Sequence, residues 1–286
     1  MSNQNCFKIS LIILALALFS TKLPAANAFE LLSVPIVGGT VVSADSSIAK
    51  RTVAIYFLVS QNGQKGAALC TGSILDSSHI LTAAHCVQNF QSGYVVFSAD
   101  QVFPLVKQVS DNGLESARGF VQAITSAKAF PGFPGMAQAN GNAGEFVDLA
   151  IITFQGGLPA SYEPAHFLDE KTLLNALTQH QDTLLSGYGM TSAPNSLSSG
   201  PSSSGFPKGV GILRQVLVHY EGISAKQIDI FVGGVAHHNA CEGDSGGPAL
   251  LNLNNEVYVI GVDSRGDCSQ HSIYTRVDQG ILAKLP

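Results

Sequence analysis

Three short segments of the chain carry residue types that can together perform nucleophilic catalysis. Residues 82–86 (TAAHC) contain His85, Asp148 precedes an apolar run, and residues 243–248 (GDSGGP) place Ser245 among glycines. A serine hydroxyl is a weak nucleophile at neutral pH and needs a base within hydrogen-bond reach. An imidazole can be that base, and a buried carboxylate can hold it in one tautomer and stabilise its positive charge. These residue types therefore indicate acyl transfer.

The glycines around Ser245 have a chemical interpretation as well. The oxyanion that forms during acyl transfer needs fixed N–H donors, and Gly243 leaves its backbone N–H accessible. Each segment also has a purely structural interpretation: His85 could pack under a disulfide, Asp148 could cap a turn, and the glycines could form only a tight loop. One segment by itself does not distinguish these interpretations.

The three segments in this order, with IVGG at residues 36–39 upstream, resemble the chymotrypsin/trypsin-like serine proteases. The resemblance runs from that point to the C-terminus. It implies that Ser245 is the nucleophile, that His85 is its general base and that Asp148 orients the base. It also implies that the N–H groups of Gly243 and Ser245 form the oxyanion hole. The expected activity is that of a serine endopeptidase that hydrolyses a protein or peptide substrate through an acyl-enzyme, without a metal or other cofactor.

The residues that would line the substrate pocket, by the same resemblance, depart from the family's pattern. Asn239, six positions before the nucleophile, would lie at the base of the pocket beside Ala240. An amide there lacks the charge that selects Arg or Lys. Ser264 and Gly266 match the strand that pairs with the substrate backbone, and Ser272 stands where glycine is common. Neutral, medium-sized or aromatic side chains therefore fit this pocket about as well as basic ones.

Asp263 and Arg265 replace a small apolar residue and an aromatic residue of the family. If Asp263 points into the pocket, its carboxylate could select a basic side chain. If it is tied to Arg265 or to a water molecule, it would not. A third alternative is a mutually solvated surface pair of these two residues. On balance we expect no preference for basic side chains.

The IVGG segment resembles the N-terminus that family members expose when a propeptide is cut. Residues 29–35 would be this propeptide, and the freed Ile36 ammonium would pair with Asp244, because an internal ammonium and carboxylate are tolerable only when paired. Trypsin-like activation sites usually end in Arg or Lys, whereas this one ends in Pro35. The activating protease would therefore lack trypsin-like specificity. A cut at Arg51 would discard IVGG, and IVGG as a simple first strand and turn is the remaining alternative.

The first 28 residues have the pattern of a secretory signal peptide. Lys8 precedes the apolar residues 9–19, and ANA at residues 26–28 supplies the small residues that a signal peptidase requires. No later segment reaches the roughly 18–20 apolar residues of a transmembrane helix. We expect cleavage after Ala28 and a secreted protein, extracellular or periplasmic, with no membrane attachment once mature.

Cysteine usage agrees with an oxidising compartment. Cys6 would leave with the signal peptide, and an even set remains. Two disulfides are therefore expected. Of the three pairings that four cysteines allow, we predict Cys70–Cys86 and Cys241–Cys268, which places one short link in each half of the chain. A zinc site would need closely spaced Cys or His ligands, which the sequence lacks.

Composition excludes other classes of function. The 286 residues include 15 Lys and Arg against 20 Asp and Glu, a net charge of -5 with no run of like charges, which disfavours nucleic-acid binding. Hydrophobic residues make up 45% of the chain and glycines number 29, which indicates a large core with many turns. We expect the mature protein to be a monomer with one protease domain, which spans residues 36–286.

Short runs rich in Val, Ile, Phe and Tyr, separated by Gly, Pro, Asn, Asp and Ser, predict a mainly antiparallel all-β protein. Only residues 169–179 and the last few residues predict helix. Residues 130–144 and 191–209, rich in small residues and proline, predict surface loops. The pattern does not separate a sandwich from a barrel. The family resemblance implies two antiparallel six-stranded β-barrels with a short C-terminal helix, in lobes of about 36–155 and 170–286.

Two rival functions stay open. The unusual Pro35, Asp263 and Arg265 would also fit a protease-like binding protein or adhesin that keeps the fold without turnover. The presence of all three triad residues argues against that alternative. An esterase that never cleaves peptides is the second alternative, because the same acyl chemistry serves both reactions.

Overall fold

The computed structural model describes residues 36–61, 64–135, 146–179, 182–191, 206–207, 209–235 and 238–286. By its internal contacts the chain divides into Met1–Leu32 and Ser33–Pro286, and every described residue belongs to the second unit. The expected signal peptide and propeptide lie outside the described residues, as does most of the two predicted surface loops. No helix in the described part of the chain is long and apolar enough to span a membrane.

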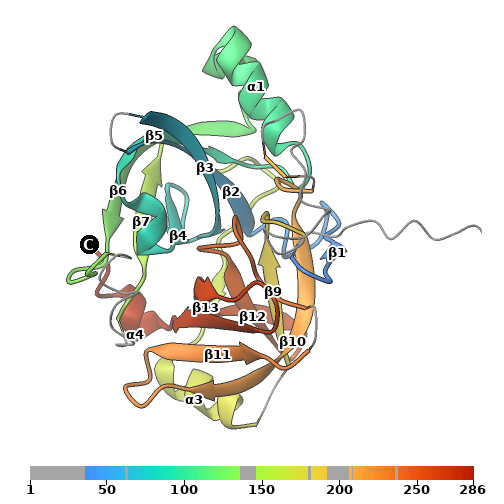
Figure 1. Ribbon diagram of the computed structural model, residues 1–286, viewed down its shortest axis with the longest axis vertical. Helices are drawn as coiled ribbons and strands as arrows, with labels where there is room; N and C mark the ends of the chain where they lie inside the picture. Colours follow the sequence, from blue (N-terminus) through green and yellow to red (C-terminus); the bar gives the residue numbers. More distant parts are fainter. Residues whose placement is uncertain are drawn as a thin grey trace, which may run out of the picture. The chain divides into compact units, whose positions relative to one another are not determined.

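The first half of the described chain forms a closed antiparallel barrel (Figure 1). Its strands follow one another around the barrel in the order β2-β3-β4-β7-β6-β5. Their bounds are β2 Thr52–Gln61, β3 Gln64–Ile74, β4 His79–Thr82, β5 Phe90–Val96, β6 Val121–Ala129 and β7 Ala150–Phe154. Alternation along β2 turns Val53, Ile55 and Phe57 into the barrel, where all three are fully buried. The 3-10 helices η1 (Ala84–Val87) and η2 (Leu114–Ala117) lie between these strands.

The second half forms another closed ring of six antiparallel strands. Its order is β9-β10-β11-β14-β13-β12, with β12 pairing back to β9. The bounds are β9 Asp182–Gly187, β10 Arg214–Ile223, β11 Asp229–Gly233, β12 Pro248–Leu253, β13 Glu256–Gly266 and β14 His271–Arg276. Two short strands join this ring, β1 (Thr40–Val41) beside β10 and β8 (His166–Phe167) parallel to β13. The predicted fold of two antiparallel six-stranded barrels is confirmed.

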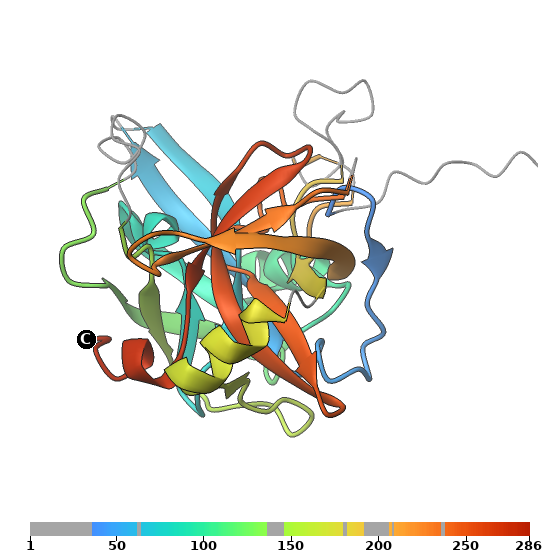
Figure 2. The same cartoon turned by 90° about the horizontal axis from the view of Figure 1, so that it is seen from below.

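The two ends of the described chain each cross to the other barrel. β1, which precedes the first barrel, pairs with the second. The short C-terminal helix α4 (Gln279–Leu282) follows the second barrel, yet Ile281 and Leu282 pack against the core of the first. Helix α3 (Glu170–Thr178) covers strands of the second barrel (Figure 2) and begins at Asp169, whose side chain accepts from the Thr172 N–H at 3.0 Å. Both predicted helices are present.

Helix α1 (Val102–Asn112) corrects the expectation of only two helical segments. It lies between β5 and β6, extends from the first barrel (Figure 1), and ends at Gly113 with a φ of 82°. Val102 and Val109 are buried, and Leu105 and Val106 pack beside them. This spacing fits one helix face. Pro104 does not interrupt the helix because it lies in the first turn, where N–H groups lack helical partners.

Candidate active site

The histidine and the aspartate of the predicted triad are joined by two hydrogen bonds. His85 lies in η1, and Asp148 lies just before β7, so neighbouring strands of the first barrel hold both. The Nδ1 atom of His85 is 2.7 Å from Asp148 Oδ2, and the His85 backbone N–H donates to Oδ1 at 2.9 Å. The Asp148 side chain is fully buried, whereas that of His85 is 15% exposed. The carboxylate therefore fixes the ring orientation and leaves the opposite ring edge accessible.

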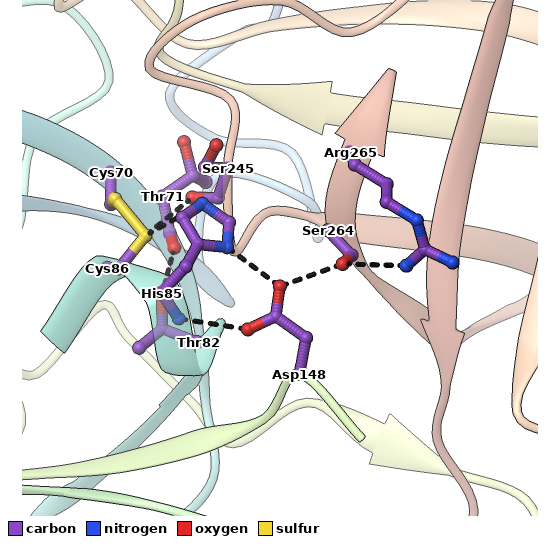
Figure 3. A network of polar contacts seen from close by, with 9 residues as sticks. All are labelled: Cys70, Thr71, Thr82, His85, Cys86, Asp148, Ser245, Ser264 and Arg265. Atoms are coloured by element: carbon purple, nitrogen blue, oxygen red, sulfur yellow. Dashed lines mark hydrogen bonds and ion pairs between the residues drawn. A yellow bond between two sulfur atoms is a disulfide. The ribbon is translucent and has the colours of Figure 1, made fainter. Parts of the chain in front are cut away.

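The third residue, Ser245, comes from the second barrel, in the loop before β12. Cys86 Sγ lies 3.8 Å from His85 Nε2 and 3.6 Å from the carbonyl oxygen of Ser245, so the histidine and the serine are neighbours. Ser245 lies on the side of the imidazole that faces away from Asp148 (Figure 3). Among the described residues, no hydrogen bond joins the Ser245 hydroxyl to the ring. Such bonds are often long before substrate binds and shorten in the complex.

Two backbone carbonyls beside Ser245 are hydrogen-bonded, which fixes the direction of the N–H groups in the same peptide units. The Glu242 carbonyl accepts from the Met190 N–H at 2.8 Å, and the Asp244 carbonyl accepts from the Gly247 N–H at 2.7 Å. The carbonyl and N–H of one trans peptide point in opposite directions. The N–H groups of Gly243 and Ser245 therefore face away from these inner partners, as oxyanion donors must. Gly243 has a φ of 96°, and a Cβ there would lie 2.8 Å from the Gly189 Cα, so the position requires glycine.

Thr71 of the first barrel holds this loop through two hydrogen bonds, a contact that the sequence did not predict. Its N–H donates to the Ser245 carbonyl and its hydroxyl donates to the Gly243 carbonyl, both at 2.9 Å. Its own carbonyl accepts from Thr82 Oγ1 at 2.8 Å. A Cβ at Gly246 would collide with Thr82 Oγ1 and the Thr71 carbonyl. The one feature of the sequence that could have indicated this role is that Thr71 follows the disulfide cysteine Cys70.

A second, unforeseen set of contacts supports Asp148 from the other side. The Ser264 hydroxyl lies 2.7 Å from Asp148 Oδ2, and Arg265 Nη1 donates to the same hydroxyl at 3.3 Å. A guanidinium can only donate, so the Ser264 proton is directed to Asp148. Arg265 Nη2 lies 2.6 Å from Asp229, whose side chain is 2% exposed, and its guanidinium lies 4.8 Å from the ring centre of Phe146. The alternative of a solvated pair between Arg265 and Asp263 is therefore wrong.

Asp244, the residue before the nucleophile, is buried in a small polar cage. Its two carboxylate oxygens accept from the N–H groups of Gly189 at 2.7 Å and Cys241 at 2.9 Å. Side chains at Gly187 or Gly189 would collide with the carboxylate. Burial raises the pKa of Asp244 to about 7, although the two N–H donors and the nearby positive charge of Arg214 act in the opposite direction. The effect of burial on this carboxylate therefore outweighs those of the N–H donors and of Arg214.

The first described residues lie close to the predicted pocket. Ile36 is fully buried, and Val37 forms an antiparallel bridge with Asn239 through N–H to carbonyl bonds of 2.9 and 3.1 Å. The nitrogen of Ile36 still belongs to the peptide bond with Pro35. It therefore carries no charge that could balance Asp244.

Asn239, predicted at the base of the pocket, is fully buried, and its amide is hydrogen-bonded to other side chains of the protein. Its Oδ1 accepts from the Ser272 hydroxyl at 2.6 Å, and its Nδ2 donates to Asp267 Oδ1 at 3.3 Å. Ser272 pairs with Gly266 across β14 and β13, and Ala240 is buried beside Asn239. The structure therefore brings together Asn239, Ser272 and Gly266, with the polar atoms of Asn239 already paired.

Asp263 is buried as well. The residue as a whole is 5% exposed, and its Oδ1 has no hydrogen-bond partner among the described residues. Burial, together with the negative charges of Asp244 and Asp148, raises the pKa of Asp263 well above the usual value. Its backbone N–H and carbonyl bind Gly247 at 2.8 Å and Gly246 at 2.9 Å, which links β13 to the nucleophile loop. A raised pKa favours the neutral form of this carboxyl.

Two disulfides join Cys70 to Cys86 and Cys241 to Cys268. The first links β3 to η1 beside His85, and the second links the nucleophile loop to the segment after β13. Both therefore stiffen segments that carry residues of the site.

Comparisons with known proteins agree with this arrangement. The Trypsin family model matches residues 49–282. The serine protease SP24D of Anopheles gambiae is 29% identical over 66% of this chain and 60% of that protein, and phenoloxidase-activating enzyme 1 of Spodoptera litura is 24% identical over 74% and 57%. Chymotrypsin-like elastase family member 1 of Bos taurus is 25% identical over 80% of this chain and 78% of that protein. The chain thus spans less than two thirds of the first two relatives. With this fold and these matches, the chain belongs to the trypsin-like family of serine proteases.

Proposed function

We propose that this protein is a serine endopeptidase in which Ser245 attacks the scissile carbonyl and His85 accepts its proton. Asp148 orients the imidazole and stabilises its positive form, and the N–H groups of Gly243 and Ser245 bind the oxyanion. The acyl-enzyme is then hydrolysed by water that His85 activates. The observation that carries this proposal is the 2.7 Å contact of His85 Nδ1 with the buried Asp148, next to the glycine-bounded Ser245.

A fluorophosphonate probe, which reacts only with an activated serine, tests this proposal together with its activation. The intact mass of the purified secreted protein is measured with and without the probe. We expect a single adduct on a chain that begins at Ile36, absent from Ser245→Ala. No adduct on a correctly processed chain would favour the non-catalytic binding protein. Activity on esters alone, in a panel of ester and peptide substrates, would favour the esterase.

For substrate preference, we propose neutral, medium-sized or aromatic side chains in the pocket based on Asn239. Its amide carries no charge, and both of its polar atoms are hydrogen-bonded, to Ser272 and to Asp267. We expect Asp263→Asn to leave the ratio of kcat/KM between arginine and phenylalanine substrates within about twofold, because Asp263 is buried and its raised pKa favours the neutral carboxyl. Kinetics on matched peptides measure this ratio. A marked fall in the arginine preference would mean that Asp263 is ionised and contacts the substrate.

For activation, we propose that the protein is made as a zymogen with signal peptide 1–28 and propeptide 29–35. Cleavage at Pro35 by a protease without trypsin-like specificity would free the Ile36 ammonium to pair with Asp244. Ile36 is fully buried next to the Val37–Asn239 bridge, and Asp244 is buried in its cage of N–H donors. An ammonium there would lower the raised pKa of Asp244 and hold the carboxylate ionised.

Asp244→Asn should therefore reduce kcat/KM of the processed protein by about 100-fold or more, because breaking a buried ion pair costs several kcal/mol. The measurement is steady-state kinetics on a chain that begins at Ile36. Acetylation of the Ile36 amine is the complementary test. It removes the cation, leaves both N–H bonds to Asp244 intact, and should lower kcat/KM as well. Unchanged kinetics in both samples would refute this activation mechanism.

We further propose secretion to an extracellular or periplasmic site and action as a monomer on protein or peptide substrates. The two disulfides support an oxidising compartment. One relative is named a phenoloxidase-activating enzyme, and another, of Gallus gallus, a urokinase-type plasminogen activator. These names are compatible with a substrate that is itself a protein precursor.

A further inference from the structure

The Arg265 side chain connects the hydrogen-bonded pair of His85 and Asp148 to a buried carboxylate of the second barrel. Its Nη1 donates to the Ser264 hydroxyl at 3.3 Å, and that hydroxyl donates to Asp148 Oδ2 at 2.7 Å (Figure 3). Its Nη2 lies 2.6 Å from an oxygen of Asp229, which begins β11 and has a side chain that is 2% exposed. One guanidinium therefore links the hydroxyl that contacts Asp148 to a carboxylate fixed in a strand.

The same guanidinium is also held from the segment that carries Asp148. The ring of Phe146, two positions before Asp148, has its centre 4.8 Å from the guanidinium carbon of Arg265. A cation over an aromatic ring is attracted by the negative face of the ring. Phe133 packs against Phe146 with ring centroids 5.8 Å apart, and the Arg265 side chain is 26% exposed. The protein thus fixes the guanidinium without any contribution from a substrate.

The contacts of Arg265 use both the shape and the charge of its head group. The planar guanidinium presents donors at fixed angles, so that one nitrogen reaches Ser264 while another reaches Asp229. Lysine has the charge but only one nitrogen, and glutamine can donate but carries no charge. An aromatic side chain, which the family usually has at this position, could not make both contacts. Substitution can therefore separate the effect of the geometry from that of the charge.

The charge of Arg265 also acts on the imidazole. Among the described residues, the ionisable groups around Asp148 include His85 from η1, Asp263 and Arg265 from β13, and Asp229 behind Arg265. The positive end of the pair of Arg265 and Asp229 is the end that contacts the Ser264 hydroxyl. A positive charge there attracts the Asp148 carboxylate and opposes a second positive charge on His85. It therefore favours the neutral imidazole, which is the form that can accept a proton.

We propose that Arg265 is a positioning residue for the triad: it fixes the Ser264 hydroxyl on Asp148 and supplies a positive charge that opposes protonation of free His85. It acts through Ser264 and Asp148 and contacts none of the reacting atoms. This inference rests on the proposed function, because His85 is a general base only in that reaction. The role is particular to this chain, since it depends on an arginine at position 265 and a buried aspartate at position 229.

Steady-state kinetics of Arg265→Gln test the positioning role. We expect kcat to fall about tenfold at pH 7 while KM changes by less than about twofold, because the variant loses the orientation of Ser264 and not a substrate contact. The acidic limb of the plot of kcat/KM against pH should move up by about half a pH unit or more, since removing a cation favours protonation of His85. Arg265→Lys should reverse most of the shift of the limb and recover only part of kcat.

Arg51→Gln is the matched control, because Arg51 forms a similar pair outside the site. It lies 2.9 Å from Glu163, and its side chain is 15% exposed. Its kcat, KM and acidic limb should equal those of the unchanged protein. If Arg265→Gln fails to fold because Asp229 has lost the guanidinium, Arg265→Gln/Asp229→Asn removes both charges. This double variant should show the same loss of kcat with a smaller shift of the limb, because the two charges act in opposite directions.

An NMR titration of the His85 ring protons in Ser245→Ala measures the effect of the charge without turnover. Adding Arg265→Gln should raise the midpoint of this titration by as much as it moves the acidic limb. An unchanged midpoint would overturn the inference. A rise in KM at constant kcat would also overturn it, because Arg265 would then contact the substrate. If the unchanged protein cleaves no substrate while the midpoint still rises, the proposed function fails and the electrostatic link between Arg265 and His85 stands.

Discussion

Ser245→Ala should lower kcat by about 10⁶-fold while the midpoint of thermal unfolding changes little. The proposed reaction has no other nucleophile, so removing the hydroxyl leaves only binding and the oxyanion donors, which give a small residual rate. The unfolding midpoint should hold because the backbone of Ser245, and not its hydroxyl, makes the contact with Thr71 at 2.9 Å. Kinetics on a cleavable peptide and calorimetry on the same sample measure both quantities.

Ser92→Ala serves as the control for that experiment, since Ser92 is exposed on β5 of the first barrel. It should retain full activity and full labelling by the fluorophosphonate. Retained turnover in Ser245→Ala would remove this residue from its proposed role. Lost turnover together with a large fall in the unfolding midpoint would point to a folding defect, which the Ser245→Cys variant with a thiol-reactive probe would separate from a chemical one.

Asp148→Asn should lower kcat/KM by about 10⁴-fold. Three donors converge on this carboxylate: the ring and the backbone N–H of His85, and the Ser264 hydroxyl. An amide has one acceptor oxygen, and its NH₂ would face one of these donors. The imidazole can relieve that clash by moving its proton from Nδ1 to Nε2, and then it can no longer accept the proton of Ser245. Steady-state kinetics and NMR of the His85 ring protons measure the rate and the tautomer.

The chain contains a matched control for this change. Asp76 pairs with His79 at 2.8 Å between Nδ1 and Oδ2, but both side chains are largely solvated, with exposures of 51% and 36%. Asp76→Asn alters the same kind of pair outside the site and should leave kcat/KM unchanged, because exposed pairs contribute little. An Asp148→Asn enzyme with nearly full activity would show that the imidazole needs no carboxylate to hold its tautomer.

The strongest local patterns predicted the corresponding elements. Helix α3 lies within residues 169–179, which the sequence predicted as helix, and β2 is one of the runs rich in Val, Ile, Phe and Tyr that predict strands. Among the described strands, several have weak local signals, and β1 and β8 are only 2 residues long. β6 has few large apolar residues, β11 is only 5 residues long, and β12 starts directly at Pro248 after the nucleophile loop. The sequence did not predict helix α1 because its five apolar residues mix with polar residues and Pro104, which weakens the periodic signal.

The sequence by itself determined which side chains can do chemistry, because the types and order of His85, Asp148 and Ser245 are local facts. Their contacts are not local. His85 and Asp148 are 63 positions apart, and Asp148 and Ser264 are 116 apart. Only the tertiary structure decided that Asp263 is buried and that Arg265 pairs with Asp229. Strand order and register in closed barrels set such neighbours, and these depend on pairing between distant segments, which no short window of sequence contains.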